Sequence, residues 1–218
     1  MKIVQNPELD NYIGSLGQTL VKSRYAGSYP YEFAVVLDPN INAFSLPGGP
    51  VFINTGLIAA ADNEGQLAGV MAHEISHVAL RHATNQASKA NLVALPAKLA
   101  GLAGGGTMLG ELAQLGIGFG AKSVLLTFSR SAESQADYNG ALIMADAGYN
   151  PIEMARFFQK LEAKYGNGIQ FLSDHPSPGN RVAAVDEEIH QMPPRAWNAD
   201  TGRFPRIRDL VARLTGAR

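Results

Sequence analysis

The segment that most constrains this chain is 70–80, which reads VMAHEISHVAL. Its residues favour a helix, and at 3.6 residues per turn His73 and His77 project from the same face, one turn apart. Two imidazoles in that arrangement can bind one metal ion, while Glu74 can reach a water molecule on the open side of the ion. The pattern therefore predicts a zinc site in which His73 and His77 are ligands and Glu74 is the general base.

The residues around this motif indicate that its helix is buried. The helix is expected to begin at Asn63, with Gln66 three residues later in a variant of the capping box. It is apolar on nearly every side, because the motif is surrounded by Val70, Met71, Ile75, Val78 and Leu80. Titratable groups in a buried helix are costly unless they are paired or bound to a metal. This favours a metal site over the alternative, in which both histidines are structural residues.

Composition limits what else the chain can be. With 218 residues, 46% of them hydrophobic and 17% charged, it suits one globular domain with a short appended segment. Its formal charge of -1 predicts no general attraction to nucleic acid. The chain has no cysteine, so any zinc ion must be bound by His, Asp or Glu, and either the bacterial envelope or the cytoplasm is compatible. Residues 1–7 lack the apolar core of a signal peptide, so we expect a cytoplasmic protein or the mature form of an exported one.

The segments before the motif predict a helix followed by a small sheet. The helix starts at Asn6–Pro7 and is expected to end near Gly27. Three extended runs follow at 31–37, 43–46 and 51–54, separated by turns rich in proline and glycine. We expect these runs to form a small antiparallel sheet next to the motif helix. The run 51–54 is expected to offer its edge to an extended substrate.

Segment 91–126 is dominated by alanine, leucine and glycine, with three consecutive glycines at 104–106. Charged residues interrupt each apolar run before it reaches the roughly 20 residues that a membrane span requires. We therefore expect mobile helices beside the cleft rather than a membrane anchor. The segment is open to three interpretations: a lid, a surface in peripheral contact with a membrane, or a contact for a partner.

A second candidate for metal binding lies in the helix expected from Ser129 to Ala147. Glu133 and Asp137 are four residues apart and share a face, where like charges repel unless cations lie nearby. A solvated acidic face would be one explanation. Burial is favoured instead, because small residues let another helix approach closely at Ala132, Ala136, Gly140 and Ala141. Buried carboxylates require a metal ion or a histidine as partner.

The remaining chain predicts two further helices and a basic end. The helices are expected at 151–165 and from Ser177 to Ile189, with His175 in the loop between them. From residue 195 onward six arginines stand against two aspartates, a local charge of +4 that fits a solvated helix face better than a binding patch. We therefore expect a single domain over 1–194 and a basic C-terminal segment over 195–218 that packs on it.

With these motifs in place, the chain resembles the gluzincin metallopeptidases of the HtpX, BepA and Oma-type family. The matching blocks follow the family's order: Asn42–Phe44, Leu46–Gly49, Thr55–Leu57, His73–His77, Ser129–Arg130, Glu133 with Asp137, Ala147–Pro151 and His175–Pro176. Soluble, periplasmic bacterial members are the most similar, because the transmembrane helices of the HtpX branch have no counterpart here. The resemblance implies an α+β, mainly helical, zincin-like (minigluzincin) domain.

The resemblance also implies roles for residues outside the motif. Glu133 would be the third ligand of one Zn²⁺ ion, and Asp137 would accept a hydrogen bond from a ligand histidine and so set its tautomer. His175 matches a position that either caps the zinc as a fourth ligand or has a catalytic role as a transition-state donor, and a plain loop histidine is the alternative. We interpret His82 and His190 as structural.

These features predict a zinc metalloendopeptidase that hydrolyses unfolded or misfolded polypeptides, with a periplasmic or cell-envelope location implied by the resemblance. One alternative is a zinc-bearing chaperone or scaffold that holds envelope proteins without cutting them. Another is a helix bundle whose zinc ion is closed by four ligands. Glu74 favours an enzyme, because a structural zinc has no use for a base beside it. The oligomeric state is not predicted.

Overall fold

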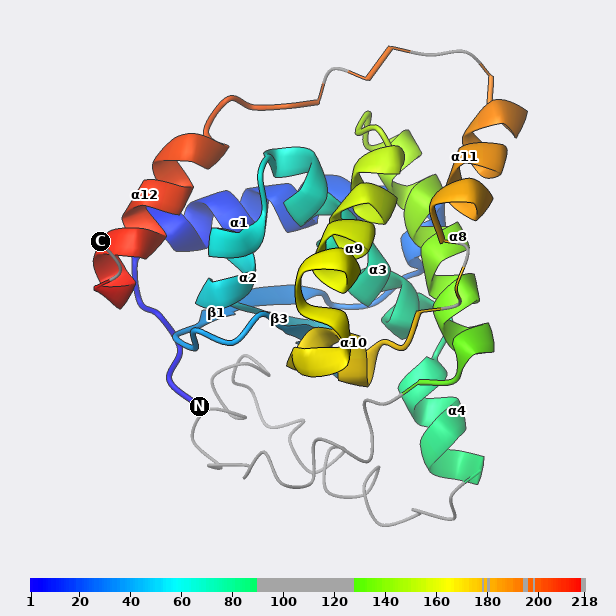
Figure 1. The fold of residues 1–218 in the computed structure, drawn as a ribbon, viewed down its shortest axis with the longest axis horizontal. Helices are drawn as coiled ribbons and strands as arrows, with labels where there is room; N and C mark the ends of the chain where they lie inside the picture. The colour runs from blue at the N-terminus through cyan, green and yellow to red at the C-terminus, as the bar shows by residue number, and fades with distance from the viewer. Residues whose placement is uncertain (90–127, 178, 180, 194–195, 198, 217–218) are drawn as a thin grey trace.

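Most of the described chain is helical, with one small sheet (Figure 1). The computed structural model describes residues 1–89, 128–177, 179, 181–193, 196–197 and 199–216. The predicted α+β, mainly helical class is confirmed. In chain order the elements are α1 (Pro7–Leu20), η1 (Arg24–Ala26), β1 (Glu32–Val36), β2 (Ala43–Ser45), β3 (Pro50–Asn54), α2 (Thr55–Ala60), α3 (Glu64–Ala79), α4 (His82–Lys89), α8 (Arg130–Asp146), α9 (Ile152–Tyr165), η3 (Gly166–Gly168), α10 (Gln170–Asp174), α11 (Arg181–Gln191) and α12 (Phe204–Thr215).

Helix α3, which carries the motif, lies at the centre of the fold. It begins where predicted, because the Asn63 side chain accepts a hydrogen bond from the Gln66 backbone N–H at 2.9 Å. Every residue from 66 to 78 is buried. Helices α8 and α9 pack against it, α11 lies on α8 and α9, and α1 approaches from the other side (Figure 1).

Two glycines let the neighbours of α3 approach closely. A Cβ atom on Gly69 would lie 2.6 Å from the Met154 side chain, so α9 packs directly on the α3 backbone at this point. A Cβ atom on Gly140 of α8 would lie 3.3 Å from the His73 backbone nitrogen. The small residues of α8 thus allow the close helix packing that the sequence predicts, and this packing brings α8 next to the two motif histidines.

The sheet corrects one prediction about strand direction. Its order is β1-β3-β2, with β2 antiparallel to β3 but β1 parallel to β3. The sheet is therefore mixed and not wholly antiparallel, because the chain passes through β2 before it returns to pair with β1. The predicted edge at 51–54 is also wrong, since β3 is buried between two neighbours. Among the described strands, β2 is the outer strand that contacts α3.

Before the motif, one helix boundary and one short helix differ from the prediction. Helix α1 ends at Leu20, and the short η1 turn follows, capped by the Ser23 hydroxyl, which accepts a hydrogen bond from the Tyr25 N–H at 3.2 Å. Gly27 has a φ of +69°, a conformation that suits glycine, so the expected stop signal ends η1 and not α1. The short helix α2 was not predicted, because its six residues are too few to show a helical period.

The first residue of α3 connects the C-terminal segment to the core. The buried Glu64 carboxylate accepts hydrogen bonds from the Tyr12 hydroxyl at 2.9 Å, the Tyr149 hydroxyl at 2.7 Å and the Thr201 backbone N–H at 3.0 Å. Helix α12 then packs on α1 and α2 with a buried face made of Phe204, Ile207, Leu210 and Val211. In the described residues, the basic segment is therefore anchored to the rest of the fold.

Within the described part of the chain, none of the helices has both the length and the apolar character that crossing a bilayer demands. The predictions for segment 91–126 fall outside the described residues, and this includes its possible roles as a lid, a membrane contact or a partner contact.

Candidate metal centre

Two ring nitrogens of α3 face each other in the interior. His73 and His77 lie one helical turn apart, their Nε2 atoms are 3.0 Å apart and their rings are inclined at 74°. Both side chains are buried. One ion can bind both nitrogens at this separation, because Zn–N bonds are about 2.0–2.1 Å long.

Helix α8 brings a carboxylate to the same point. The Ser129 hydroxyl caps the helix by accepting a hydrogen bond from the Ala132 N–H at 3.2 Å, and Glu133 follows in the first turn. Its side chain is fully buried. Oε2 of Glu133 lies 3.3 Å from His73 Nε2, and Oε1 lies 3.5 Å from His77 Nε2.

The segment after α10 supplies a third imidazole. The backbone N–H of His175 donates to the Phe171 carbonyl at 2.8 Å, and its ring stacks on the Phe171 ring with centroids 4.7 Å apart. Its Nδ1 atom lies 3.2 Å from His73 Nε2 and 3.2 Å from Glu133 Oε1. One ligand atom each from His73, His77, Glu133 and His175 therefore falls within a group whose members are all within 4.8 Å of one another.

Glu74 lies beside this group without belonging to it. Its Oε2 atom accepts a hydrogen bond from the Ser45 hydroxyl of β2 at 3.0 Å, which holds one side of the carboxylate. Its Oε1 atom is buried, lies 3.3 Å from His175 Nε2 and has no hydrogen-bond donor among the described residues. One carboxylate oxygen is thus anchored, while the other lies beside the ring of His175, one of the four converging residues.

The donor set fits a metal ion. Imidazole nitrogens and a carboxylate are ligands that zinc accepts in a tetrahedral arrangement, and four such groups converge here from three separate segments. Two unprotonated ring nitrogens 3.0 Å apart would repel each other through their lone pairs. The Glu133 oxygens beside them would repel the same lone pairs. A metal ion at this point removes that repulsion, and in the metal-free protein a proton on one ring does so.

A buried arginine binds both the Glu133 and the Asp137 carboxylate. Arg181 Nε donates to Asp137 Oδ2 at 2.6 Å, Nη2 donates to Glu133 Oε2 at 3.2 Å, and the guanidinium lies 4.3 Å from the centroid of the Phe158 ring. The other oxygen of Asp137 lies 3.0 Å from His73 Nδ1. The like charges at 133 and 137 thus share one cation, which lowers their mutual repulsion.

A second chain of contacts reaches the other ligand histidine. His82 Nδ1 lies 2.9 Å from His77 Nδ1, and His82 Nε2 lies 3.1 Å from the Gln135 side-chain oxygen. Because that oxygen can only accept, His82 donates to it from Nε2 and must accept at Nδ1 from the N–H of His77. This tautomer leaves the Nε2 lone pair of His77 directed at the centre.

The electrostatics of the centre favour one charged histidine before a metal binds. Burial alone would lower the pKa of His73, but Glu133 and Asp137 beside it outweigh burial and raise its pKa to about 9. Burial raises the pKa of Glu133, but His175 and His73 outweigh it and hold this pKa well below its usual value. Burial, reinforced by neighbouring His73, holds the pKa of His77 well below its usual value. Binding of a cation must therefore displace a proton from His73.

The structure brings together all six residues singled out from the sequence: His73, Glu74, His77, Glu133, Asp137 and His175. His190 lies apart on an exposed face of α11. Three contacts were missed. Ser45, Gln135 and Arg181 carry no motif of their own. His82, interpreted as structural, contacts His77 through its ring nitrogen.

A helix-borne His–Glu–x–x–His motif beside a glutamate from a second helix is the arrangement of a metallopeptidase of the gluzincin class. The chain belongs to peptidase family M48, whose family model matches residues 7–189. The family expected from the motifs is therefore confirmed.

Named relatives agree with this assignment. Over 209 residues the chain is 33% identical to the "Beta-barrel assembly-enhancing protease" of Escherichia coli (strain K12), and the match covers 88% of this chain and 41% of that protein. It is 34% identical over 201 residues to the "Putative beta-barrel assembly-enhancing protease" of Vibrio cholerae, with the same coverage of 88% and 41%. It is 31% identical over 192 residues to the "Mitochondrial metalloendopeptidase OMA1" of Schizosaccharomyces pombe, covering 87% of this chain and 56% of that one. The chain thus spans between two fifths and three fifths of the length of these relatives.

Proposed function

We propose that the chain is a zinc-dependent metalloendopeptidase that hydrolyses peptide bonds of unfolded or misfolded proteins. The observation that carries the proposal is the buried Glu74 carboxylate, which has one oxygen anchored by Ser45 and the other without a hydrogen bond beside His175 at the metal centre. The membership of the chain in peptidase family M48 supports the reaction type. A structural metal site would not need a buried, half-satisfied carboxylate beside it.

His73, His77 and Glu133 would hold the zinc ion. When bound, zinc polarises the scissile carbonyl and lowers the pKa of a bound water molecule from about 15.7 to about 7. Asp137 orients the His73 ring through Nδ1, and Arg181 keeps the Asp137 and Glu133 carboxylates in place. Two imidazole nitrogens and one carboxylate are a ligand set that catalytic zinc sites use.

Glu74 would move the proton. Its free Oε1 accepts the proton of the attacking water and then delivers it to the leaving amine nitrogen. The hydrogen bond from Ser45 holds Oε2, so the carboxylate need not rotate between these two steps. Because Ser45 belongs to β2, the outer strand next to α3, we place the polypeptide substrate along this side of the site.

The Glu74→Gln substitution tests the base. We expect the variant to retain zinc, because Glu74 is not among the four converging ligand residues. We expect it to lose cleavage of casein or of reduced, unfolded protein by about 10²-fold or more. Glu162→Gln, which changes an exposed carboxyl on α9, is the matched control and should cleave normally. Turnover by Glu74→Gln equal to that of the control would refute the assigned base.

We further propose that His175 is a fourth ligand that restrains the enzyme. Its Nδ1 lies among the ligand atoms and its Nε2 faces Glu74, so the ring fills the space that the attacking water requires. We expect His175→Ala to raise the rate of peptide cleavage, with exposed His190→Ala as the control. A fall in rate would assign His175 as a transition-state donor instead, and an unchanged rate would make it a loop residue.

We propose a location in the bacterial cell envelope and envelope proteins as substrates. The names of the two bacterial relatives refer to the assembly of β-barrels, and β-barrels span the bacterial outer membrane. Fractionation of cells that express the full-length protein tests this location. Recovery of the protein in the cytoplasmic fraction alone would contradict it.

A further inference from the structure

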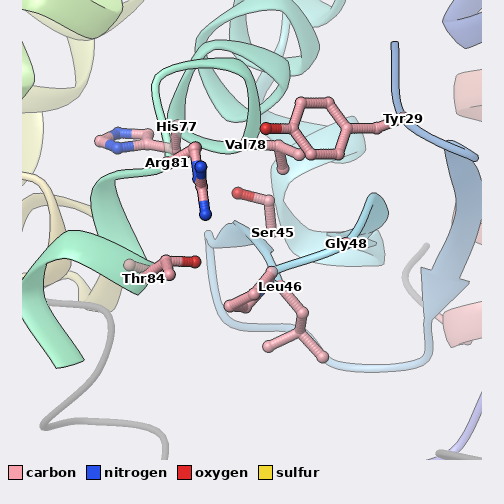
Figure 2. A pocket seen from close by; sticks show the side chains of 10 residues that line it. Tyr29, Ser45, Leu46, Gly48, His77, Val78, Arg81 and Thr84 are labelled. Carbon is pink, nitrogen blue, oxygen red and sulfur yellow. The ribbon is translucent and has the colours of Figure 1, made fainter. Parts of the chain in front are cut away.

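A pocket of about 350 Å³ opens beside the metal centre (Figure 2). Its ten lining residues come from three segments: the loop at Tyr29, the end of β2 with the turn that follows it, and the junction between α3 and α4. His77 lines both this pocket and the metal centre. Ser45, another lining residue, donates the hydrogen bond that holds Glu74. The pocket therefore adjoins the point at which a peptide bond would be cut.

Arg81 gives this pocket its charge. None of the ten lining residues is acidic, and Arg81 is the one with a permanent positive charge. Its side chain extends from the end of α3 toward the space beside Ser45 (Figure 2). No carboxylate of the described residues forms an ion pair with Arg81, whereas Arg181 behind the metal centre binds two. The pocket thus presents a guanidinium that the described part of the chain does not neutralise.

The backbone of Arg81 has a conformation that is unusual for a residue other than glycine. With a φ of +59°, Arg81 is the one described residue other than glycine with a positive φ. Its N–H donates to the Val78 carbonyl at 3.0 Å and closes the end of α3. Glycine adopts this conformation at the lowest cost and is the common residue at this place after a helix. The turn alone would therefore favour glycine over an exposed arginine at this position.

We propose that this pocket is a subsite for a carboxylate of the polypeptide substrate, and that Arg81 determines this specificity. The proposal rests on the peptidase function proposed above. The planar guanidinium can donate two parallel N–H bonds to a carboxylate, a geometry that lysine lacks. The carboxylate can belong to an Asp or Glu side chain next to the scissile bond, or to the C-terminus of a short peptide.

Internally quenched peptides test the proposal with the zinc-loaded, full-length chain. One series has blocked ends and differs only in a single Glu or Gln, placed in turn at three positions on each side of the cleaved bond. A second series carries Gln throughout and a free or amidated C-terminus. We expect kcat/KM to be about tenfold higher for the carboxylate at one position, which corresponds to about 1.4 kcal/mol. The difference should lie mainly in KM.

Variants of Arg81 show whether its guanidinium causes the preference for a carboxylate in the substrate. Arg81→Gln should reduce the Glu-to-Gln ratio to about one, and Arg81→Glu should instead favour Lys at the same position. Arg81→Gly should behave as Arg81→Gln and fold well, because glycine accepts the positive φ. The control, Arg213→Gln, removes a charge from the exposed face of α12 and should keep the preference.

Binding provides a readout that does not need turnover. The anisotropy of labelled Glu and Gln peptides is measured with zinc-loaded Glu74→Gln protein, with and without Arg81→Gln. A preference that depends on Arg81, in cleavage or in binding, supports the subsite, and the two peptide series show whether a side chain or the C-terminus supplies the carboxylate. Cleavage without such a preference overturns the subsite and leaves the peptidase function intact. If the wild type cleaves no peptide, the proposed peptidase function is refuted. The binding measurements then test the carboxylate subsite on their own.

Discussion

At the scale of single residues, the outer nitrogens of the two motif histidines have different partners. His73 faces the Asp137 carboxylate, whereas His77 faces the neutral ring of His82, which in turn contacts Gln135. Burial lowers the pKa of His82, which favours the neutral ring that this arrangement requires. Both partners set the tautomer that directs Nε2 at the metal, but only the carboxylate adds negative charge.

We expect His82→Leu to weaken zinc binding. The substitution removes the acceptor for the His77 N–H and leaves that group buried without a partner, and losses of this kind typically lower metal affinity by about 10–100-fold. Competition with a chromophoric chelator measures the affinity. His190→Leu, on an exposed face, is the control. Equal zinc affinities for the two variants would show that His82 only fills space.

At the scale of elements, the close contact between α3 and α9 depends on a glycine. An alanine Cβ at position 69 would approach Met154 to 2.6 Å at its Cβ and 2.7 Å at its Cα, so the helices must move apart. We expect Gly69→Ala to destabilise the protein by about 1–3 kcal/mol. Urea unfolding monitored by circular dichroism measures this loss.

Gly14→Ala is the matched control for this prediction. Gly14 lies in α1, and nothing lies within 4 Å of the position that a Cβ atom would take. Alanine should therefore stabilise the helix by about 0.4–1 kcal/mol. A Gly69→Ala protein as stable as Gly14→Ala would contradict the tight packing of α3 on α9.

Local signals in the sequence predicted the elements better than their pairing. The cap at Asn63 and the cap at Ser129 begin α3 and α8 as expected, because an N-cap is a contact between residues two or three apart. The direction of β1 was missed, because strand direction depends on where a distant segment packs and not on its own pattern of residues.

The same limit applies to the candidate site. Histidine and carboxylate spacing pointed to five residues, His73, Glu74, His77, Glu133 and Asp137, and the family resemblance added His175. The fold brings all six together. Arg181 and Ser45 carry no motif of their own. Their contacts with Asp137 and Glu74 span 44 and 29 positions in the chain and arise only from the packing of α11 on α8 and of β2 on α3.

At the scale of the whole molecule, the metal centre couples stability to pH. In the metal-free protein the pKa of His73 is about 9, above its ordinary value of 6.5, because the effects of Glu133 and Asp137 exceed that of burial. The resulting stabilisation is complete below pH 6.5 and is lost as the pH rises through about 9. The lowered pKa of Glu133 changes the free energy of unfolding only near and below pH 4.5, and the lowered pKa of His77 changes it only below about pH 6.5. Neither group therefore contributes to the loss between pH 6.5 and 9.

We therefore expect chelator-treated protein to lose free energy of unfolding between pH 6.5 and 9.5, by an amount on the order of 3 kcal/mol. Urea unfolding at four pH values across this range measures the loss. His73→Asn lacks the titrating ring and should show a much flatter profile. Zinc-loaded protein should also lack the loss, because zinc binds the unprotonated ring and its apparent affinity grows as the proton leaves. A metal-free wild type whose stability stays level or rises over the same range would show that His73 is neutral before zinc binds, and that Glu133 and Asp137 are balanced by Arg181 alone.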